Sequence, residues 1–273
     1  MALSTKVSGT WKEVNGVYTR VGGSWKTVSN IHTRVNGVWK EVYALTGGND
    51  AYTVLLIHAD GADASTVFTD SSSSGHQVNT RGTAQVDTAQ SKFGGASALL
   101  DGNSDYLSCD AHADWGFGAD PFTFDMWVRM NALPAIGGVH MLVCQFEDAA
   151  NYFRFYLYNV EGTYRLYLDN KVGDVIKGSV YGTFTSLSVN TWYHLACVRS
   201  GSTIYMFQDG EALSVTTNTS FGSNNAGNGN WPIRFGTMAG DTAFFNGWID
   251  ELRISKGIAR WTADFTPPTA AYS

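Results

Sequence analysis

The sequence predicts an all-β protein whose antiparallel strands form a two-sheet sandwich. Its 273 residues include 30 Gly, 15 Phe, 13 Tyr and 9 Trp but only 5 Pro, which is typical of strands joined by tight turns. Apolar and polar residues alternate with period two in most segments, as in Phe122–Met130, and helix signals are nearly absent. About ten such segments, separated by turn residues, favour stacked sheets over a small barrel.

Residues 1–45 contain an internal repeat. Copies of a 14-residue unit begin at Val7, Val21 and Val35, and each has a Gly turn followed by Trp and Lys. Each copy predicts a strand, a turn and a strand, so we expect a small β-meander. Three such units bury too little surface to be stable as a thin sheet, so a second layer must cover them. The rest of the chain or another subunit could supply that layer.

The repeated tryptophans are Trp11, Trp25 and Trp39. The simplest interpretation is that their rings pack and fix the strand register through cross-strand pairs. Sugar-stacking platforms and an assembly surface are the alternatives. We interpret residues 1–45 as an attachment or oligomerisation module, with these three tryptophans as the candidates for assembly contacts.

A composition break with paired glycines marks a linker at residues 46–51, so a second domain spans residues 52–273. Asp209-Gly210 between two apolar runs is a strong hairpin signal. We expect strands in this domain at Val54–His58, Ala96–Leu100, Phe122–Met130, His140–Phe146, Tyr152–Tyr158, Tyr164–Asp169, Thr191–Arg199, Thr203–Gln208, Ile233–Gly236 and Phe245–Ser255.

Charge and hydropathy exclude two classes of partner. The net charge is −6 and no basic run exceeds two residues, so we expect no nucleic-acid binding. No window approaches 18 consecutive apolar residues, and residues 1–7 do not resemble a cleaved signal, so we expect neither membrane insertion nor a signal peptide. Cys109, Cys144 and Cys197 are odd in number and lack metal-ligand spacing, which predicts buried reduced thiols.

A set of short motifs follows in order along the second domain. They are Leu55-Leu-Ile-His58-Ala-Asp60-Gly61, Ser91-Lys-Phe93-Gly94-Gly95-Ala, Asp101-Gly102, Phe122–Arg129, Asn190–Arg199, Gln208-Asp209-Gly210 and Phe245–Ser255. As a set they resemble the laminin-G-like jelly rolls of the concanavalin A-like lectin/glucanase superfamily. The segment Gly257–Pro268 is similar to copies in bacteriophage structural proteins. The Trp-Lys repeats resemble short repeats of phage tail and fibre proteins.

Because the superfamily includes glycoside hydrolases, we searched for catalytic carboxylates. Glycoside hydrolysis uses two carboxyl groups about 5–10 Å apart, which on a strand requires acids two or four positions apart. The adjacent pairs Asp250-Glu251 and Glu147-Asp148 alternate to opposite faces, and no serine elbow or phosphate loop is present. We therefore predict that the protein is not an enzyme.

Laminin-G-like jelly rolls often hold a structural calcium ion. The topology of that family implies that Asp60, Asp70 and Asp250 are the metal candidates. The alternative is that these carboxylates cap turns. Asp101-Gly-Asn-Ser-Asp105 resembles the start of a calcium loop but has His112 in place of the bidentate Glu, so we interpret it as a turn. No other cofactor is required.

Polar loops beside aromatic rings supply the chemistry of a sugar site, because amides bond hydroxyl groups and rings offer stacking surfaces. The carbohydrate-binding candidates are Asn224, Asn225, Asn228, Asn230, Trp231, Trp115, Asn151 and Tyr152. The alternative is that Asn and Gly form turns and Trp231 plugs one end of the sandwich.

These inferences imply a non-catalytic phage virion protein, such as a tail fibre or spike, that presents a glycan-binding jelly roll for host recognition. Its expected partners are other virion proteins, through residues 1–45, and a host-surface glycan. We expect a homo-oligomer, trimeric if the protein is a fibre or spike. One alternative is a capsid-decoration or tail-adaptor protein without sugar binding. A glycan-processing enzyme is the second.

Overall fold

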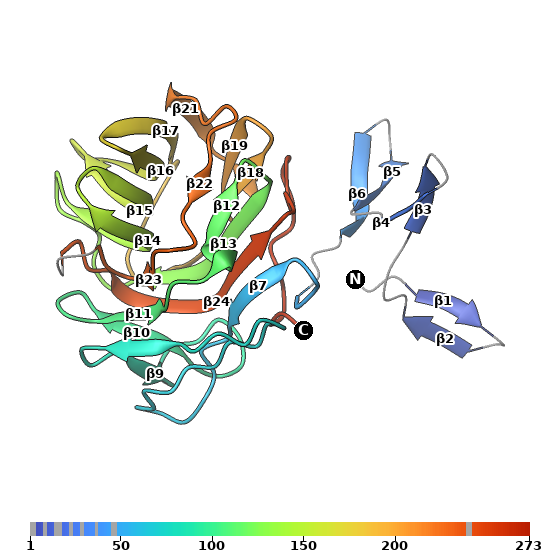
Figure 1. Cartoon of the computed structure of the whole chain (residues 1–273). Helices are drawn as coiled ribbons and strands as arrows, with labels where there is room; N and C mark the ends of the chain where they lie inside the picture. Colours follow the sequence, from blue (N-terminus) through green and yellow to red (C-terminus); the bar gives the residue numbers. More distant parts are fainter. Residues whose placement is uncertain are drawn as a thin grey trace. The chain divides into compact units, whose positions relative to one another are not determined.

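The computed structural model describes most of the chain, which divides into two compact units, residues 1–47 and 48–273 (Figure 1). In the first unit it describes the strand backbones at 4–7, 10–13, 18–21, 24–27, 30–35 and 38–44, and in the second unit residues 48–238 and 242–273. Side chains are described in residues 48–238 and 242–273.

The strands of the first unit pair two by two. Strand β1 (Ser4–Val7) pairs with β2 (Thr10–Glu13), β3 (Tyr18–Val21) with β4 (Ser24–Thr27), and β5 (Asn30–Val35) with β6 (Val38–Ala44). The described strands therefore form three separate hairpins, where we expected one continuous meander. Each hairpin encloses the glycine of one copy, Gly9, Gly23 or Gly37, which is the turn signal of the repeat.

The three hairpins have the same strand register around the repeated tryptophan. The backbone of Trp11 lies opposite Lys6, that of Trp25 opposite Arg20, and that of Trp39 opposite Arg34. The side chains of the three tryptophans lie outside the described residues, so their assembly role stays a prediction.

The second unit consists of two stacked antiparallel sheets, as the sequence predicts. The β13 sheet runs in the order β20 (Glu211–Ala212), β19 (Thr203–Gln208), β18 (Trp192–Ser200), β13 (Phe122–Met130), β24 (Asn246–Lys256), β10 (Ser97–Asp101) and β9 (Gln85–Asp87), with β7 (Thr53–Ile57) also paired to β24. The β15 sheet runs in the order β21 (Ser214–Thr219), β17 (Val175–Thr183), β16 (Thr163–Val172), β15 (Asn151–Val160), β14 (Val139–Asp148), β23 (Ile233–Phe235), β11 (Tyr106–Cys109) and β8 (Asn79–Arg81).

Two short elements complete this unit. Strand β12 (Gly116–Gly118) pairs with β22 (Ala226–Gly227), and a single 3₁₀ turn, η1 (Ala113–Trp115), precedes β12. In the described part of the chain, no helix is long and apolar enough to cross a membrane.

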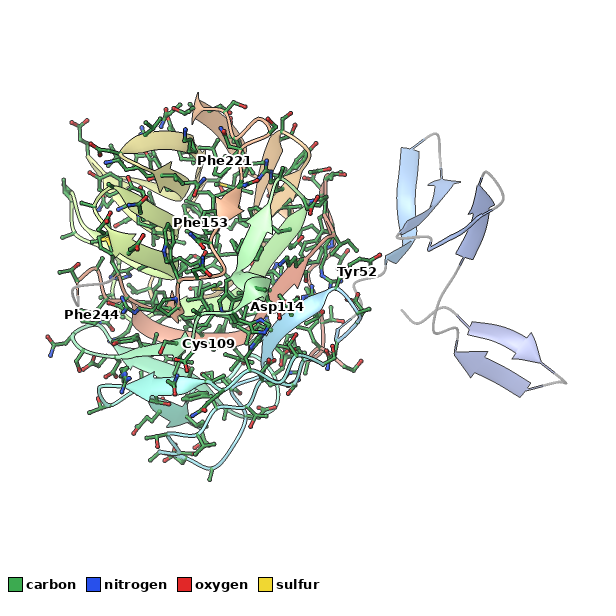
Figure 2. The ribbon with its side chains drawn as sticks, in the orientation of Figure 1. Tyr52, Cys109, Asp114, Phe153, Phe221 and Phe244 are labelled. Atoms are coloured by element: carbon green, nitrogen blue, oxygen red, sulfur yellow. The ribbon has the colours of Figure 1, made fainter. Side chains whose placement is uncertain are left out.

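The core lies between the two sheets and is rich in phenylalanine. Phe122 and Phe124 of the β13 sheet meet Phe153 of the β15 sheet with ring centroids 5.8–6.0 Å apart. Phe153 and Phe221 are fully buried inside the unit (Figure 2). Burying each such ring contributes about 1.5–3 kcal/mol, so the alternating apolar positions of the strands explain the stacking of the sheets.

Cys109, Cys144 and Cys197 are buried, as predicted. Burial raises the pKa of Cys109 to about 12, which keeps this thiol protonated and unreactive at neutral pH.

The predicted alternation of Asp250 and Glu251 is wrong, because β24 contains a bulge at these residues. Glu251 has a φ of 50°, and the register jumps from Asp125 opposite Arg253 to Trp127 opposite Asp250. Strict alternation predicts that Asp250 and Glu251 point to opposite faces. Because of the extra residue, Ile249 and Leu252 both face the core, and both carboxylates lie on the outer side of the sheet.

The C-terminal segment 257–273 covers that outer face. Trp261 packs on β18 and β19 and stacks on Phe265 with ring centroids 4.0 Å apart. Residues 48–51, predicted as linker, belong to the same layer. Asp50 forms an ion pair with Arg260 at 2.9 Å, and the Asn49 amide donates to the Ser273 carbonyl.

Candidate functional site

The outer side of the β15 sheet carries a continuous group of aromatic and charged side chains, which we name the tyrosine face. Its members are Phe146, Tyr152, Arg154, Tyr156, Tyr158, Arg165, Tyr167, Asp169, Lys171 and Tyr181. They occupy alternate positions of β14 to β17, while the intervening residues, such as Phe153 and Leu168, point into the core. The sheet therefore has a buried apolar side and an outer amphipathic side.

Three tyrosines form a row across the middle of this face. Tyr156 lies opposite Tyr167, and Tyr167 lies opposite Tyr181, with ring centroids 5.3 and 4.9 Å apart. Tyr156 is nearly buried, and its hydroxyl donates to Asp169 Oδ2 at 2.6 Å. Burial and the neighbouring Asp169 carboxylate raise the pKa of Tyr156, so this hydroxyl remains a donor. The side chains of Tyr167 and Tyr181 are partly exposed.

Two arginines flank the row. The Arg154 guanidinium lies 3.8 Å from the Tyr152 ring centre and 3.3 Å from Asp169, while that of Arg165 lies 4.4 Å from the Tyr181 ring centre. The side chains of both arginines are partly exposed. Aromatic rings beside guanidinium donors can hold a polyhydroxylated ligand.

One predicted pair of sugar ligands borders this face. Tyr152 stacks parallel to Phe146 with ring centroids 6.3 Å apart. The neighbouring Asn151 amide donates to Asp148, and its carbonyl oxygen accepts from the Gly173 amide, so Asn151 fixes the adjoining turns. Tyr152 is thus a member of the face, and Asn151 supports it.

The other predicted ligands lie together elsewhere. Pairing of β12 with β22 brings Trp115 close to the loop 223–231, but Trp115 is fully buried and Trp231 is 9% exposed. Neither ring can stack on a ligand in this conformation.

Two asparagines of this loop form hydrogen bonds with backbone groups of the protein. The Asn224 amide donates to the Lys177 carbonyl at 2.7 Å, and Asn228 Oδ1 accepts from the Asn230 amide at 2.9 Å. Asn225 and Asn230 remain exposed. The fully buried Arg199, which the sequence analysis did not single out, donates to the carbonyls of Gly118, Gly201, Gly222 and Asn224. The loop is therefore a rigid structural element.

Of the predicted metal candidates, Asp70 does not fit a calcium site. Its two oxygens accept four hydrogen bonds, from the amides of Leu56, Ser72 and His76 and the hydroxyl of Ser72, which occupy its lone pairs. The carboxylate caps a turn, as in the alternative that we considered.

Asp60 and Asp250 flank the turn at Gly94. Asp250 Oδ2 accepts from the amides of Lys92 and Phe93, and a Cβ on Gly94 would collide with the Asp60 carboxylate. This close approach explains the Phe-Gly-Gly motif. Burial, with added repulsion from Glu251 and Asp60, raises the pKa of Asp250 to about 7. Two carboxylates fall short of the six to eight oxygens that calcium takes, so these side chains do not by themselves form a calcium site.

The bulge in β24 places Asp250 and Glu251 on the same side of the β13 sheet, as the two carboxyl groups of a glycoside hydrolase would be. Both are 1% exposed. Glu251 contacts His58 at 2.8 Å and accepts from the Tyr272 amide, so it is occupied by the covering layers. Both carboxylates are buried within packed structure, whereas a hydrolase needs its two carboxyl groups on either side of an accessible sugar bond.

A surface pocket of about 460 Å³ lies within a single loop. It is lined by residues 66–70 and 75–80, which include Asp70 and His76. None of the predicted sugar ligands lines this pocket.

Comparison with known proteins agrees with this architecture. Residues 101–260 match the family described as the concanavalin A-like lectin/glucanases superfamily. No curated protein matches the chain. The binding domain of Paraclostridial mosquitocidal protein 1 superposes with a TM-score of 0.55 and 16% identity, over 77% of this chain and 50% of that chain. The botulinum neurotoxin serotype C1 binding domain superposes with a TM-score of 0.54 and 12% identity, over the same shares of the two chains.

A third solved structure is matched almost completely. Domain 4 of an extracellular arabinanase from Geobacillus stearothermophilus, in complex with arabinotriose, superposes with a TM-score of 0.54 and 18% identity, over 77% of this chain and 95% of that domain. This chain spans half the length of the two toxin binding domains. At these identities the likenesses show the fold. The family match covers more than half of the sequence, and the chain belongs to the concanavalin A-like lectin/glucanases superfamily.

Proposed function

We propose that this protein is a non-catalytic phage virion protein whose jelly roll binds a glycan on the host surface. The observation that carries the proposal is the tyrosine face. It combines the partly exposed side chains of Tyr167 and Tyr181 with the partly exposed guanidinium-bearing side chains of Arg154 and Arg165. Glycan hydroxyl groups both donate and accept hydrogen bonds, so they complement such a surface.

The structural neighbours support a binding role. Two are binding domains of toxins, and the third was solved with a bound oligosaccharide, arabinotriose. The packing around Asp250 and Glu251 supports a role without catalysis, because those carboxylates are occupied by other parts of the chain.

The virion context rests on the repeats of the first unit and on the Gly257–Pro268 segment, which resembles phage structural proteins. Three hairpins of four to seven residues per strand have little capacity to bury a core alone, which favours attachment to other virion proteins or to further copies of this chain. Many copies on one particle would raise avidity without any new contact.

A glycan array probed with multivalent full-length protein tests the proposal. We expect binding to a restricted set of glycans, and we expect Tyr167→Ala to weaken it at least tenfold, because that ring is the centre of the row. Tyr52→Ala is the matched control, since Tyr52 is 41% exposed and lies outside the face.

A blank array with multivalent protein would contradict glycan binding and favour a structural virion role. Binding that Tyr167→Ala leaves unchanged would place the glycan site elsewhere. Release of sugar products from host polysaccharide would overturn the non-catalytic role.

A further inference from the structure

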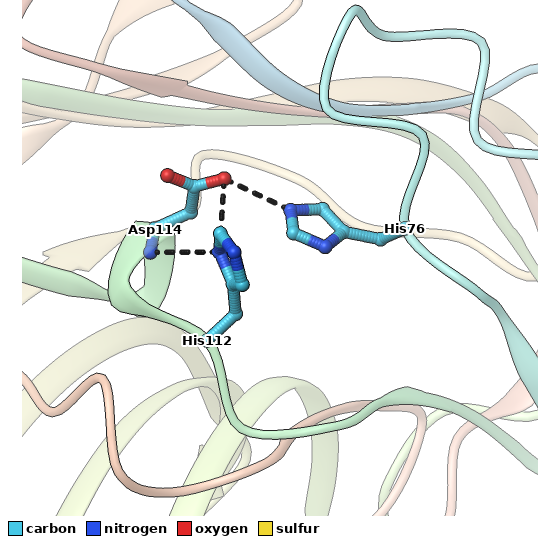
Figure 3. A group of neighbouring side chains, drawn as sticks. All are labelled: His76, His112 and Asp114. Carbon is cyan, nitrogen blue, oxygen red and sulfur yellow. Dashed lines mark hydrogen bonds and ion pairs between the residues drawn. The ribbon is translucent and has the colours of Figure 1, made fainter.

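We propose that His76, His112 and Asp114 form a binding site for a divalent transition-metal ion, with Zn²⁺ as the preferred ion. His76 Nε2 lies 2.9 Å from Asp114 Oδ2, and His112 Nδ1 lies 3.2 Å from the same oxygen (Figure 3). One ligand atom from each side chain lies within 4.8 Å of the others. Among the described residues, no other group of three His, Cys, Asp or Glu side chains is this compact.

The spacing and chemistry suit zinc. Zinc binds nitrogen and carboxylate oxygen at about 2.0–2.1 Å in a tetrahedron, so neighbouring ligand atoms lie about 3.3 Å apart. The two measured separations are close to this value. Two imidazoles with one carboxylate favour zinc and its first-row neighbours over calcium or magnesium, which take oxygen ligands.

Hydrogen bonding within the cluster also favours a cation. The backbone amide of Asp114 donates to His112 Nδ1 at 3.2 Å, so this nitrogen carries a lone pair. The same nitrogen faces Asp114 Oδ2, which is also an acceptor. A neutral imidazole nitrogen has one lone pair in the ring plane, so His112 Nδ1 either accepts from the Asp114 amide or binds a metal ion. An ion between His112 Nδ1 and Asp114 Oδ2 would replace that hydrogen bond, would separate two acceptors that otherwise repel each other, and would also bind His76 Nε2.

The surrounding residues hold the ligands in place. The Ser74 hydroxyl donates to Asp114 Oδ2 at 3.1 Å, and the His76 amide donates to Asp70 at 2.7 Å. The Trp115 ring lies 4.5 Å from the His76 ring, and its indole nitrogen donates to the Asp110 carbonyl. Such outer contacts orient metal ligands and tune their affinity.

The cluster is closed on one side and open on the other. The side chains of His76 and Asp114 are 11% and 22% exposed, whereas that of His112 is 51% exposed. Three protein ligands with one open side leave the fourth position to water or to a ligand from outside. The ion would also join the loop that contains His76 to η1, two segments far apart in the sequence.

Titration of metal-free full-length protein with Zn²⁺ by calorimetry, and with Co²⁺ by visible absorption, tests this site. We expect one ion per jelly roll, with the absorption of tetrahedral cobalt and a higher melting temperature in zinc. His112→Asn should lower the affinity at least about tenfold. Asn keeps an acceptor for the Asp114 amide, so the turn should fold normally. Asp114→Asn is the second variant.

The control is His58→Gln, which removes a histidine that pairs with a single carboxylate, Glu251. It should bind metal as the natural chain does. The proposal is overturned if the natural chain binds neither ion, or if His112→Asn and Asp114→Asn, with unchanged circular dichroism, bind as tightly as the control.

Discussion

At the residue scale, a buried ion pair fastens the C-terminal segment to the β13 sheet. Asp125 Oδ1 accepts from Arg253 Nε at 3.0 Å, the Tyr272 hydroxyl also donates to Asp125, and all three side chains are buried. Burial by itself would raise the pKa of Asp125, but the interactions with Arg253 and His194 outweigh it and lower the pKa to about 2. The carboxylate is therefore charged throughout the neutral range.

Replacing Asp125 by Asn should destabilise the fold by about 3–5 kcal/mol, because Arg253 loses its buried counter-charge. The folded pKa lies below the unfolded value of about 4, so the stability that this carboxylate contributes is complete above pH 4. It should be lost as the pH falls towards 2. Urea unfolding between pH 2 and 7 measures both effects.

The exposed Glu147 provides the control for that series. Glu147→Gln should leave both the stability at pH 7 and its loss in acid unchanged, because this side chain lies on the surface. An Asp125→Asn variant as stable as the Glu147→Gln protein would contradict the account of the ion pair.

At the scale of elements, the sequence predicts those strands whose alternation is strict. Phe122–Met130 and Thr203–Gln208 were predicted with the bounds that the structure has. Strand β17 was missed because Gly178 and Gly182 weaken its strand signal. The structure supplies the reason for Gly178, since a Cβ there would lie 2.5 Å from the Phe221 ring.

Gly178→Ala should therefore destabilise the protein by about 1–3 kcal/mol through overpacking. Combining it with Phe221→Leu should recover part of that loss, because the smaller side chain leaves room for the new methyl group. Thermal unfolding of both variants checks this, with Ser179→Ala as the control on the same strand. A Gly178→Ala protein as stable as the control would show that Phe221 does not restrict this position.

The candidate sites were less predictable than the strands. Tyr152 was identified because it follows a polar turn, but Tyr156, Tyr167 and Tyr181 were not. Their alternation is visible within each strand, whereas their alignment into one row depends on the register of three strands. Similarly, His76 and Asp114 meet only through the tertiary fold.

At the scale of the whole molecule, we propose that the first unit serves attachment and the second serves recognition. The second unit has its own core between two stacked sheets. In the described residues, the first unit consists of three separate two-stranded hairpins. Assembly should therefore depend on residues 1–47.

Light scattering at micromolar concentration should show an oligomer for the full chain and a monomer for residues 48–273. This difference follows if the repeat module supplies the contacts between copies. A full chain that remains a monomer would contradict the proposed assembly role, and an oligomer that persists without residues 1–47 would move the interface to the jelly roll.

The proposed function requires that the tyrosine face binds glycan. The most direct test is to add the best oligosaccharide from the array to isotope-labelled protein and to record amide chemical shifts. The account predicts that the largest changes lie on β15, β16 and β17, around Tyr156, Tyr167 and Tyr181. Changes confined to the loop 223–231, or the absence of any change at saturating oligosaccharide, would contradict it.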